Sequence, residues 1–386
     1  MKRNLLVKFN RSSIAPRVLM AATILATCGA GSAIAEGDAS SVTDASSVIK
    51  DGKIGYVLSY KHWALYQTPE GKTECPQGFN DGPREQFKVL FPDDGQKRTL
   101  METQIARESE VWHPGLSEEP YEFREVEGKV SRGLNLDGKV SADDFVSPEG
   151  DEGIDNQLYR TIGCVANFRG PDGTAYHFEN SFMQTYNFNR FVIELSGVDD
   201  IVNDDDVTVT TYRGLDFLLT DATGKDFIPG GTQRIDMRWG KPFIQEFKGK
   251  IVDGVLTTEA ADVDMPWSST FATSSVHSLR GVKFEMKITP DGAEGLMAGY
   301  ADIQDWYYHA TTTWSTHHQS YGQESSPSIY RAMHRLADGY PDPKTGKNTA
   351  LSMAIDVKFT QVFIVRPSQE VASEDAKTMD RVASAK

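Results

Sequence analysis

The stretch from residue 190 to residue 289 constrains the fold more than any other part of this sequence. Its last arm, residues 282–289, alternates apolar side chains with charged or polar ones, in the order Val282, Lys283, Phe284, Glu285, Met286, Lys287, Ile288, Thr289. Alternation with a period of two is typical of a strand that buries one face. Residues 247–258 contain two β-rich arms that meet at Asp253 and Gly254, a pair that tolerates the positive φ angles of a type I′ turn. This stretch therefore predicts an antiparallel sheet.

Strand patterns also lie on either side of that stretch. Residues 54–67 are rich in aromatic and β-favouring residues, and residues 350–365 alternate apolar residues with smaller or polar ones. No repeat of fixed period is found, which disfavours solenoids and propellers. We therefore predict a mainly β protein with an antiparallel β-sandwich or jelly-roll-like core.

Two helices are expected near the C-terminus. Asp302 is placed to cap a helix over residues 302–320. Ser326 and Pro327 have the order typical of a helix start, and the helix that they open should stop at Gly339. The prediction is a small two-helix insertion over about residues 302–339.

The first 35 residues have the composition of a signal peptide. Five basic residues and no acid precede an apolar segment that ends in Ala33, Ile34 and Ala35, the small-x-small pattern of a cleavage site. A rival interpretation is a lipoprotein signal that ends at Cys28, for which Thr27 is a poor fit. We expect cleavage after residue 35 and an exported product, periplasmic or extracellular.

The remaining chain divides by composition. Residues 36–50 and 367–386 are polar and are expected to be disordered tails, and residues 51–366 form a single large β-rich domain. No segment after the leader approaches the roughly 18 apolar residues that a membrane-spanning helix requires. The exported product is therefore expected to be soluble, with no transmembrane segment.

The charge of the chain argues against nucleic acid as a partner. The full chain carries a formal charge of −15, the leader contributes +5, and the mature protein is therefore near −15 − 5 = −20. Nucleic-acid binding depends on clusters of Lys and Arg that neutralise phosphates. An acidic protein of this kind repels phosphate backbones.

Two cysteines remain after the leader is removed, Cys75 and Cys164. An even pair in an exported protein most simply forms one disulfide. The alternative, a thiolate nucleophile or metal ligand, is disfavoured in an oxidising compartment. No Cys-x-x-Cys-His motif is present, so no c-type haem is indicated.

An acidic, Gly-rich loop between residues 128 and 156 is the first candidate site. Its sequence resembles the calcium loop of EF-hand and dockerin modules at four positions, occupied by Asn135, Asp137, Gly138 and Val140. The resemblance covers twelve residues only and implies calcium bound by oxygen ligands.

The same loop also departs from that pattern. Gly133 stands where the first aspartate ligand belongs, and Asp144 replaces the bidentate glutamate. Further ligands could come from Asp151 or Asp155. The tentative calcium ligands are therefore Asn135, Asp137, Asp144, Asp151 and Asp155, and the alternative is a solvated acidic loop that binds no ion.

A second candidate is a group of side chains on the predicted helix from residue 302. Asp305, His309 and His317 recur at spacings that place them on one helix face. The two histidines would lie about 12 Å apart at a rise of 1.5 Å per residue, so one ion could not bridge them. These three residues are the first to test for catalysis, and the alternative is histidines packed beside tryptophans in a helix–sheet contact.

Motifs of several enzyme classes are missing from the sequence. It has no Gly-x-Ser-x-Gly elbow, no phosphate-binding loop and no dinucleotide fingerprint, so no nucleotide cofactor is indicated. No family resemblance extends over the chain. The leading hypothesis is a secreted binding or surface-assembly protein without chemistry of its own that binds an unknown small-molecule, glycan or protein ligand and is stabilised by Ca²⁺ if the acidic loop holds that ion.

Two other functions stay open. One is a periplasmic or extracellular hydrolase or lyase that acts on a polysaccharide or other polymer, with aromatic side chains as subsites. The other is a periplasmic metal-handling protein that uses the histidines.

Removal of calcium tests the acidic loop. If the loop from Asn135 to Asp155 holds Ca²⁺, EGTA lowers the melting temperature of the purified mature protein, because a ligand that binds only the folded state stabilises it. Differential scanning calorimetry with and without EGTA measures the shift. An unchanged melting temperature would remove calcium from the hypothesis.

Overall fold

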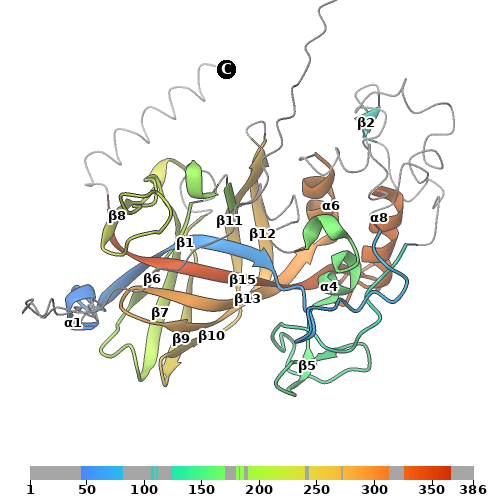
Figure 1. The fold of residues 1–386 in the computed structure, drawn as a ribbon, viewed down its shortest axis with the longest axis horizontal. Coiled ribbons are helices and arrows are strands. Elements are labelled where there is room, and N and C mark those ends of the chain that lie inside the picture. The colour runs from blue at the N-terminus through green and yellow to red at the C-terminus, as the bar shows by residue number, and fades with distance from the viewer. Residues whose placement is uncertain are drawn as a thin grey trace, which may run out of the picture. The chain divides into compact units, whose positions relative to one another are not determined.

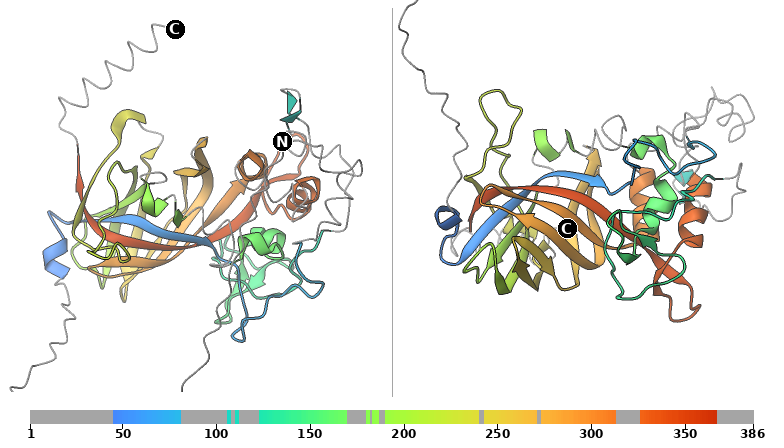
Figure 2. Two further views of the ribbon diagram at one scale, coloured as in Figure 1. Left: turned by 45° about the horizontal axis from the view of Figure 1, so that its top comes forward. Right: turned by 60° about the horizontal axis from the view of Figure 1, so that its bottom comes forward.

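Eight antiparallel strands close into a barrel in the computed structural model of this protein (Figure 1). In the order of hydrogen bonding, the ring strands are β1 (Lys53–Trp63), β6 (Phe191–Ser196), β7 (Asp204–Arg213), β9 (Glu246–Val252), β10 (Val255–Thr258), β12 (Thr273–Ile288), β13 (Gly292–Asp302) and β15 (Asn348–Val365). Strand β15 pairs back onto β1, from Val362 opposite Gly55 to Ile355 opposite Trp63, and this pairing closes the ring. Figure 2 shows the strands curving round the core from two further directions.

The prediction of a β-sandwich or jelly-roll-like core is therefore wrong, although the mainly β content agrees with it. A sandwich keeps two separate sheets, whereas here each ring strand is hydrogen-bonded to a neighbour on both sides. The alternation of apolar and polar residues shows only that one face of a strand is buried, and it is the same in both architectures. Closure depends on the pairing of β1 with β15, which are about 300 residues apart, and no local pattern encodes that pairing.

The structure describes residues 45–80, 106–107, 110–111, 123–169, 180–181, 183–186, 190–239, 243–270, 273–312 and 326–366. The expected signal peptide and C-terminal tail lie outside these residues. Besides the ring strands, the elements are α1 (Ala45–Val48), β2 (Ala106–Arg107), β3 (Glu110–Val111), β4 (Phe145–Val146), β5 (Glu152–Ile154), α4 (Gln157–Ile162), η3 (Ala166–Phe168), β8 (Gly231–Arg234), η4 (Met237–Trp239), β11 (Ala261–Thr270), α6 (Ile303–Thr312), α8 (Ser326–Arg335) and β14 (Gly339–Pro341). None of the helices in the described part of the chain combines the length and apolar composition that a bilayer crossing requires.

The inside of the barrel is filled by apolar side chains. Tyr56 of β1, Phe191 of β6, Phe284 of β12 and Phe359 of β15 are at most 4% exposed and belong to one packed cluster. An eight-stranded barrel is just wide enough for inward side chains to fill it. The ring therefore has a packed core, and its outward faces are available to hold other segments.

Local turn chemistry predicted one connection correctly. Asp253 and Gly254 join β9 to β10 with φ angles of 51° and 77°, as the type I′ turn requires. Residues 233–239 also alternate apolar with polar side chains, but they form the end of β8 and then the 3₁₀ turn η4. The buried Asp236 carboxylate accepts hydrogen bonds from the backbone and guanidinium of Arg238, and this local bonding competes with strand pairing.

The two expected C-terminal helices are α6 and α8, and they lie with α4 near one end of β15 (Figure 1). The carboxylate of Asp302 accepts hydrogen bonds from the backbone N–H groups of Gln304 and Asp305, so Asp302 caps α6 as the sequence indicates. Residues 313–325, which include the second half of the longer predicted helix, lie outside the described residues.

The outward faces of β13 and β15 hold the segment from residue 123 to residue 169. Three small residues, Ala298 on β13 and Ala350 and Ala354 on β15, pack in one cluster with Leu136 of this segment. Buried Asn156 caps α4 through its side-chain oxygen, and its amide donates to the backbone oxygens of Ala64 and Arg132. These bonds fix the residues next to Asn156 relative to the barrel.

Residues 45–50 differ from the tail expected over residues 36–50. Residues 45–48 form the short helix α1, and Val48 is 5% exposed within the main apolar cluster. The remaining residues of that predicted tail lie outside the described part of the chain.

The structure joins Cys75 and Cys164 in a disulfide with a Cα–Cα distance of 5.7 Å. Cys164 follows α4 and is fully buried against Phe145 and Tyr159, in a small cluster that also includes Val126. The bond therefore ties the chain after β1 to the segment that covers the outer face of the barrel. Such a pair is compatible with an oxidising compartment.

Replacing both cysteines with alanine should lower the free energy of unfolding by about 4 kcal/mol, because the bond closes a loop with a sequence separation of 89 residues. Urea unfolding of the mature wild type and of Cys75→Ala/Cys164→Ala measures the loss. Dithiothreitol should destabilise the wild type only. Equal stability of the two proteins would mean that the loop is not constrained by this bond.

Candidate functional site

A cavity of about 580 Å³ lies between the outer face of β13, the segment around α4, and the connection from α8 to β14. Six acidic and three basic side chains are among those that line it. The acidic ones are Glu127, Asp137, Asp143, Asp144, Asp155 and Asp338, and the basic ones are Lys129, Arg160 and Arg335. We refer to this space as the acidic cavity. Its volume is in the range typical of sites for small organic ligands.

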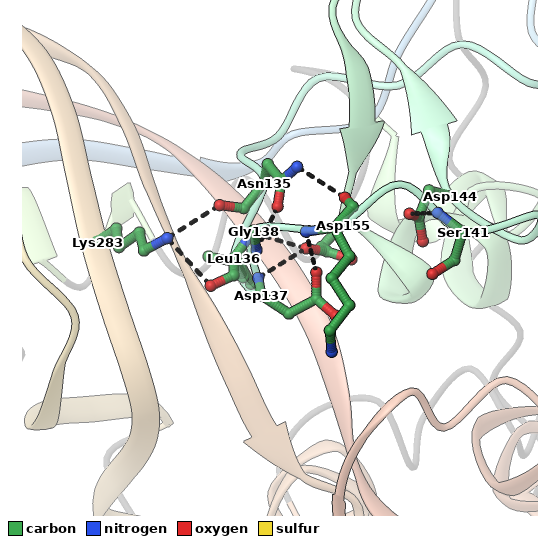
Figure 3. Close-up of polar contacts among 9 residues, drawn as sticks. Asn135, Leu136, Asp137, Gly138, Ser141, Asp144, Asp155 and Lys283 are labelled. Atoms are coloured by element: carbon green, nitrogen blue, oxygen red, sulfur yellow. Dashed lines mark hydrogen bonds and ion pairs between the residues drawn. The ribbon is translucent and has the colours of Figure 1, made fainter.

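Asp155 lies at the end of β5, directly before the Asn156 cap of α4. It is 5% exposed, and its Oδ2 accepts hydrogen bonds from the backbone N–H groups of Leu136 at 2.6 Å and Asp137 at 3.4 Å (Figure 3). The pKa of this carboxyl is raised to about 6, chiefly by burial and in addition by the charges of Asp144 and Asp137, against the lowering effect of the two N–H groups. Its Oδ1 has no hydrogen-bond partner among the described residues.

Asp338 reaches the cavity from the loop between α8 and β14. Its Oδ1 accepts a hydrogen bond from the backbone N–H of Ser352 on β15 at 2.7 Å. Burial raises the pKa of Asp338 to about 6, and the charge of Asp155 raises it as well, against the lowering effect of the Ser352 bond. The carboxylate of Asp338 also accepts a hydrogen bond from the side chain of Ser352, whereas Oδ1 of Asp155 makes no hydrogen bond with the part of the chain that the structure describes.

Tyr300 extends from the outer face of β13 and lines the same cavity. The residue is 8% exposed, and its ring packs edge-on against Tyr340 with 5.4 Å between the ring centroids. Burial raises the pKa of the phenol, and the charges of Asp155, Asp338 and Asp137 raise it further, so the hydroxyl stays protonated at neutral pH. Within the described residues this hydroxyl has no hydrogen-bond partner.

Two of the three basic side chains in the lining are held by other groups. Arg335 forms an ion pair with Glu125 at 2.7 Å, and Arg160 donates to Gln157 and to the backbone oxygen of Val126. Their charges are therefore partly engaged outside the innermost part of the cavity, where Asp155, Asp338 and Tyr300 meet. That part offers three oxygen atoms with unused hydrogen-bonding capacity and a negative potential.

The structure brings three of the five predicted calcium ligands, Asp137, Asp144 and Asp155, to the lining of one cavity. The side chain of Asn135 instead bonds within its own turn, accepting from the N–H of Gly138 at 2.6 Å (Figure 3). Asp151 bonds to the hydroxyl of Ser147 at 3.1 Å and does not line the cavity.

The acidic loop is shaped by its own hydrogen bonds and by one lysine of the barrel. Oδ1 of Asp137 accepts from the backbone N–H of Lys139, and Asp144 accepts from the N–H of Ser141. Gly138 has a φ of 77°, the sharp turn that the sequence indicated. Lys283 of β12 donates to the backbone oxygens of Asn135 and Leu136, both at 3.0 Å, and so holds the loop against the barrel (Figure 3).

Among the described residues, no group of three or more His, Cys, Asp or Glu side chains is arranged to hold a metal ion. The carboxylates of the loop are instead occupied, at least in part, by backbone N–H groups. Calcium binding by this loop stays a prediction that awaits the EGTA measurement.

Of the predicted group Asp305, His309 and His317, only the side chain of Asp305 is described. Asp305 lies in the first turn of α6, where burial and the charge of Asp302 raise the pKa of its carboxyl. His309 belongs to α6, but its side chain is not described, and His317 lies outside the described residues. The catalytic hypothesis for these three residues stays a prediction.

Sequence reasoning did not find Tyr300 or Asp338. Tyr300 stands in a strand of small residues and Asp338 at the end of a helix, and neither position carries a motif. Both become site residues only because the covering segment places Asp155 opposite them. The one available signal was the density of acids between residues 137 and 155, which indicated four of the six acidic side chains in the lining, Asp137, Asp143, Asp144 and Asp155.

Comparisons of this chain with protein-family models, with curated proteins and with solved structures find no significant match. The function is therefore inferred from the geometry of the acidic cavity.

Substituting Asn for Asp338 should stabilise the protein at pH 7.5 by about 3 kcal/mol. The pKa of Asp338 is about 6 in the folded protein, against about 3.9 in an unfolded chain. Between these values the folded state retains a proton that the unfolded state has released, so the stability of the wild type falls as the pH rises from 4 to 6 and stays at the lower value above that range. Asp338→Asn removes this loss and should match the wild type near pH 4.

Urea unfolding at pH 4 and pH 7.5 measures this effect. Asp253→Asn is the matched control, because Asp253 sits in an exposed turn whose positive φ asparagine also tolerates. A variant that is less stable than the wild type at pH 7.5 would show that the buried carboxylate is not a source of destabilisation.

Proposed function

We propose that this chain is an exported protein that binds a small polar ligand in the acidic cavity and has no chemistry of its own. The observation that carries the proposal is the set of oxygens of Asp155, Asp338 and Tyr300 with free acceptor capacity in one cavity of about 580 Å³. Carboxylates in a partly desolvated site are stabilised by a ligand that donates hydrogen bonds to them.

The closed barrel supports a binding role. Tyr300 is part of β13, Asp338 is bonded to β15, and Asp155 is bonded to the segment that Asn156 pins to β15. The hydrogen-bonded ring therefore holds all three oxygens in position. A preorganised site loses little conformational entropy on binding. The Cys75–Cys164 disulfide and the basic, then apolar, N-terminal sequence support export to the periplasm or the exterior.

The second candidate is a hydrolase or lyase. One observation favours it, because two neighbouring carboxyls with pKa values of about 6 in a cavity suit general acid–base catalysis near neutral pH. We rank it below binding, because desolvation of carboxylates in a site that awaits a cation raises their pKa values in the same way.

Thermal-shift measurements with a panel of small polar molecules test the proposal. The panel contains monosaccharides, amino acids, amines and divalent ions, and a true ligand near 100 times its Kd should raise the melting temperature by about 3 °C or more. The shift should persist in Asp253→Asn and disappear in Asp155→Asn and Asp338→Asn. Asparagine keeps an oxygen for the backbone N–H of Leu136 or Ser352, so both variants should fold.

Two outcomes would count against a binding protein. If no compound gives a shift that the cavity variants abolish, the acidic cavity is not a ligand site. If a saccharide oligomer is cleaved by the wild type and not by Asp155→Asn, the hydrolase takes its place.

A further inference from the structure

The acidic cavity presents hydrogen-bond acceptors from three separate segments at one place. Asp155 accepts from backbone N–H groups and Asp338 accepts from the backbone and side chain of Ser352, but an ionised carboxylate has about four lone-pair sites, so each can accept further hydrogen bonds. The Tyr300 hydroxyl can accept through its lone pairs while its proton points elsewhere. The residue is 8% exposed, lies among the two aspartates, and bonds to none of the described residues. This largely buried tyrosine, whose hydroxyl lines the cavity, is an observation independent of the cluster of acids.

The charge of the lining favours a cation. Two carboxylates that repel each other in a partly desolvated site are stabilised by a positive group between them. Arg335 and Arg160 are bonded to Glu125, to Gln157 and to the backbone, and among the described residues none of the three basic side chains of the lining, Lys129 included, forms an ion pair with Asp155 or Asp338. A positive group from outside the chain is what the inner part of the cavity lacks.

We propose that the ligand is a small organic molecule with a primary ammonium group, which bonds to Asp155, Asp338 and Tyr300. This inference rests on the proposed function and names the class of its ligand. A primary ammonium has three N–H donors and no acceptor, so it can donate to all three residues together.

The size of the cavity separates this ligand from a metal ion. A space of about 580 Å³ holds a molecule of many atoms, and the described His, Cys, Asp and Glu side chains do not form a group of three arranged around one ion. Asp143 and Asp144 lie in the same lining, on the loop that leads into β4. They provide a second negative region for a molecule with ammonium groups at both ends, so a short diamine is the best probe.

Isothermal titration calorimetry at pH 7.5 tests the proposal with two probes of the same charge. The first is 1,4-diaminobutane, and the second is 1,4-bis(trimethylammonio)butane, which has no N–H donors. The wild type and Asp253→Asn should bind the diamine and should bind the quaternary compound about 10-fold more weakly or not at all. Equal affinity for both probes would overturn the proposal, since it would show that N–H donors are not recognised.

Variants locate the site. Asp155→Asn and Asp338→Asn should each weaken diamine binding by about 10-fold or more, because each replaces a charged acceptor with a neutral amide. Tyr300→Phe should weaken it by about 5-fold. This variant retains the ring packing on Tyr340 and loses only the hydroxyl, so its melting temperature should stay close to that of the wild type.

The remaining outcomes show whether the ammonium ligand, the proposed binding function, or both are wrong. If the diamine does not bind, or binds equally well to all variants, the ammonium ligand is wrong. If calcium chloride binds instead and the aspartate variants abolish that binding, the cavity is an ion site, the proposed binding function stands and this inference fails. If neither probe, nor calcium, nor any compound of the thermal-shift panel binds in a way that the variants abolish, both fail.

Discussion

The pairing of β15 with β1 on one side and β13 on the other is the constraint on which the rest of the structure depends. It turns an eight-stranded sheet into a closed ring, so the inward side chains pack against each other and the ring strands have no unpaired edge. Strand β15 has 18 residues and also bonds to β8 and β14, so one strand connects the ring to the segments outside it.

The acidic cavity is a consequence of what lies on the outward face of that strand. Ala350 and Ala354 leave room for Asn156, whose amide reaches three oxygen atoms of other segments. A larger side chain at either alanine would push α4 and Asp155 away from the barrel. The packing of small residues therefore decides that Asp155 lies opposite Asp338 and Tyr300. Burial among other acids then raises the pKa of its carboxyl.

The placement of the cavity outside the ring also has a physical reason. The barrel interior is filled mainly by aromatic and aliphatic side chains, whereas the polar groups of the acidic cavity lie on the outward faces of the strands and on the segments that cover them. There, the disulfide and the buried Asn156 hold a loop-rich segment that has only short strands of its own. Carboxylates that are half withdrawn from water are stabilised when a cation joins them, and this is the property on which the functional proposals rest.

The sequence by itself determined the strand content, the turn at Asp253 and Gly254, the start of α6 at Asp302 and the presence of an acidic Gly-rich loop. Each of these depends on residues close together in the chain, through alternation, backbone conformation or a local hydrogen bond. Only the tertiary structure decided that the strands form a barrel, and that Tyr300 and Asp338 face Asp155. Those outcomes depend on contacts between residues tens to hundreds of positions apart, and the free energy of such contacts comes from packing and closure that no short stretch of sequence contains.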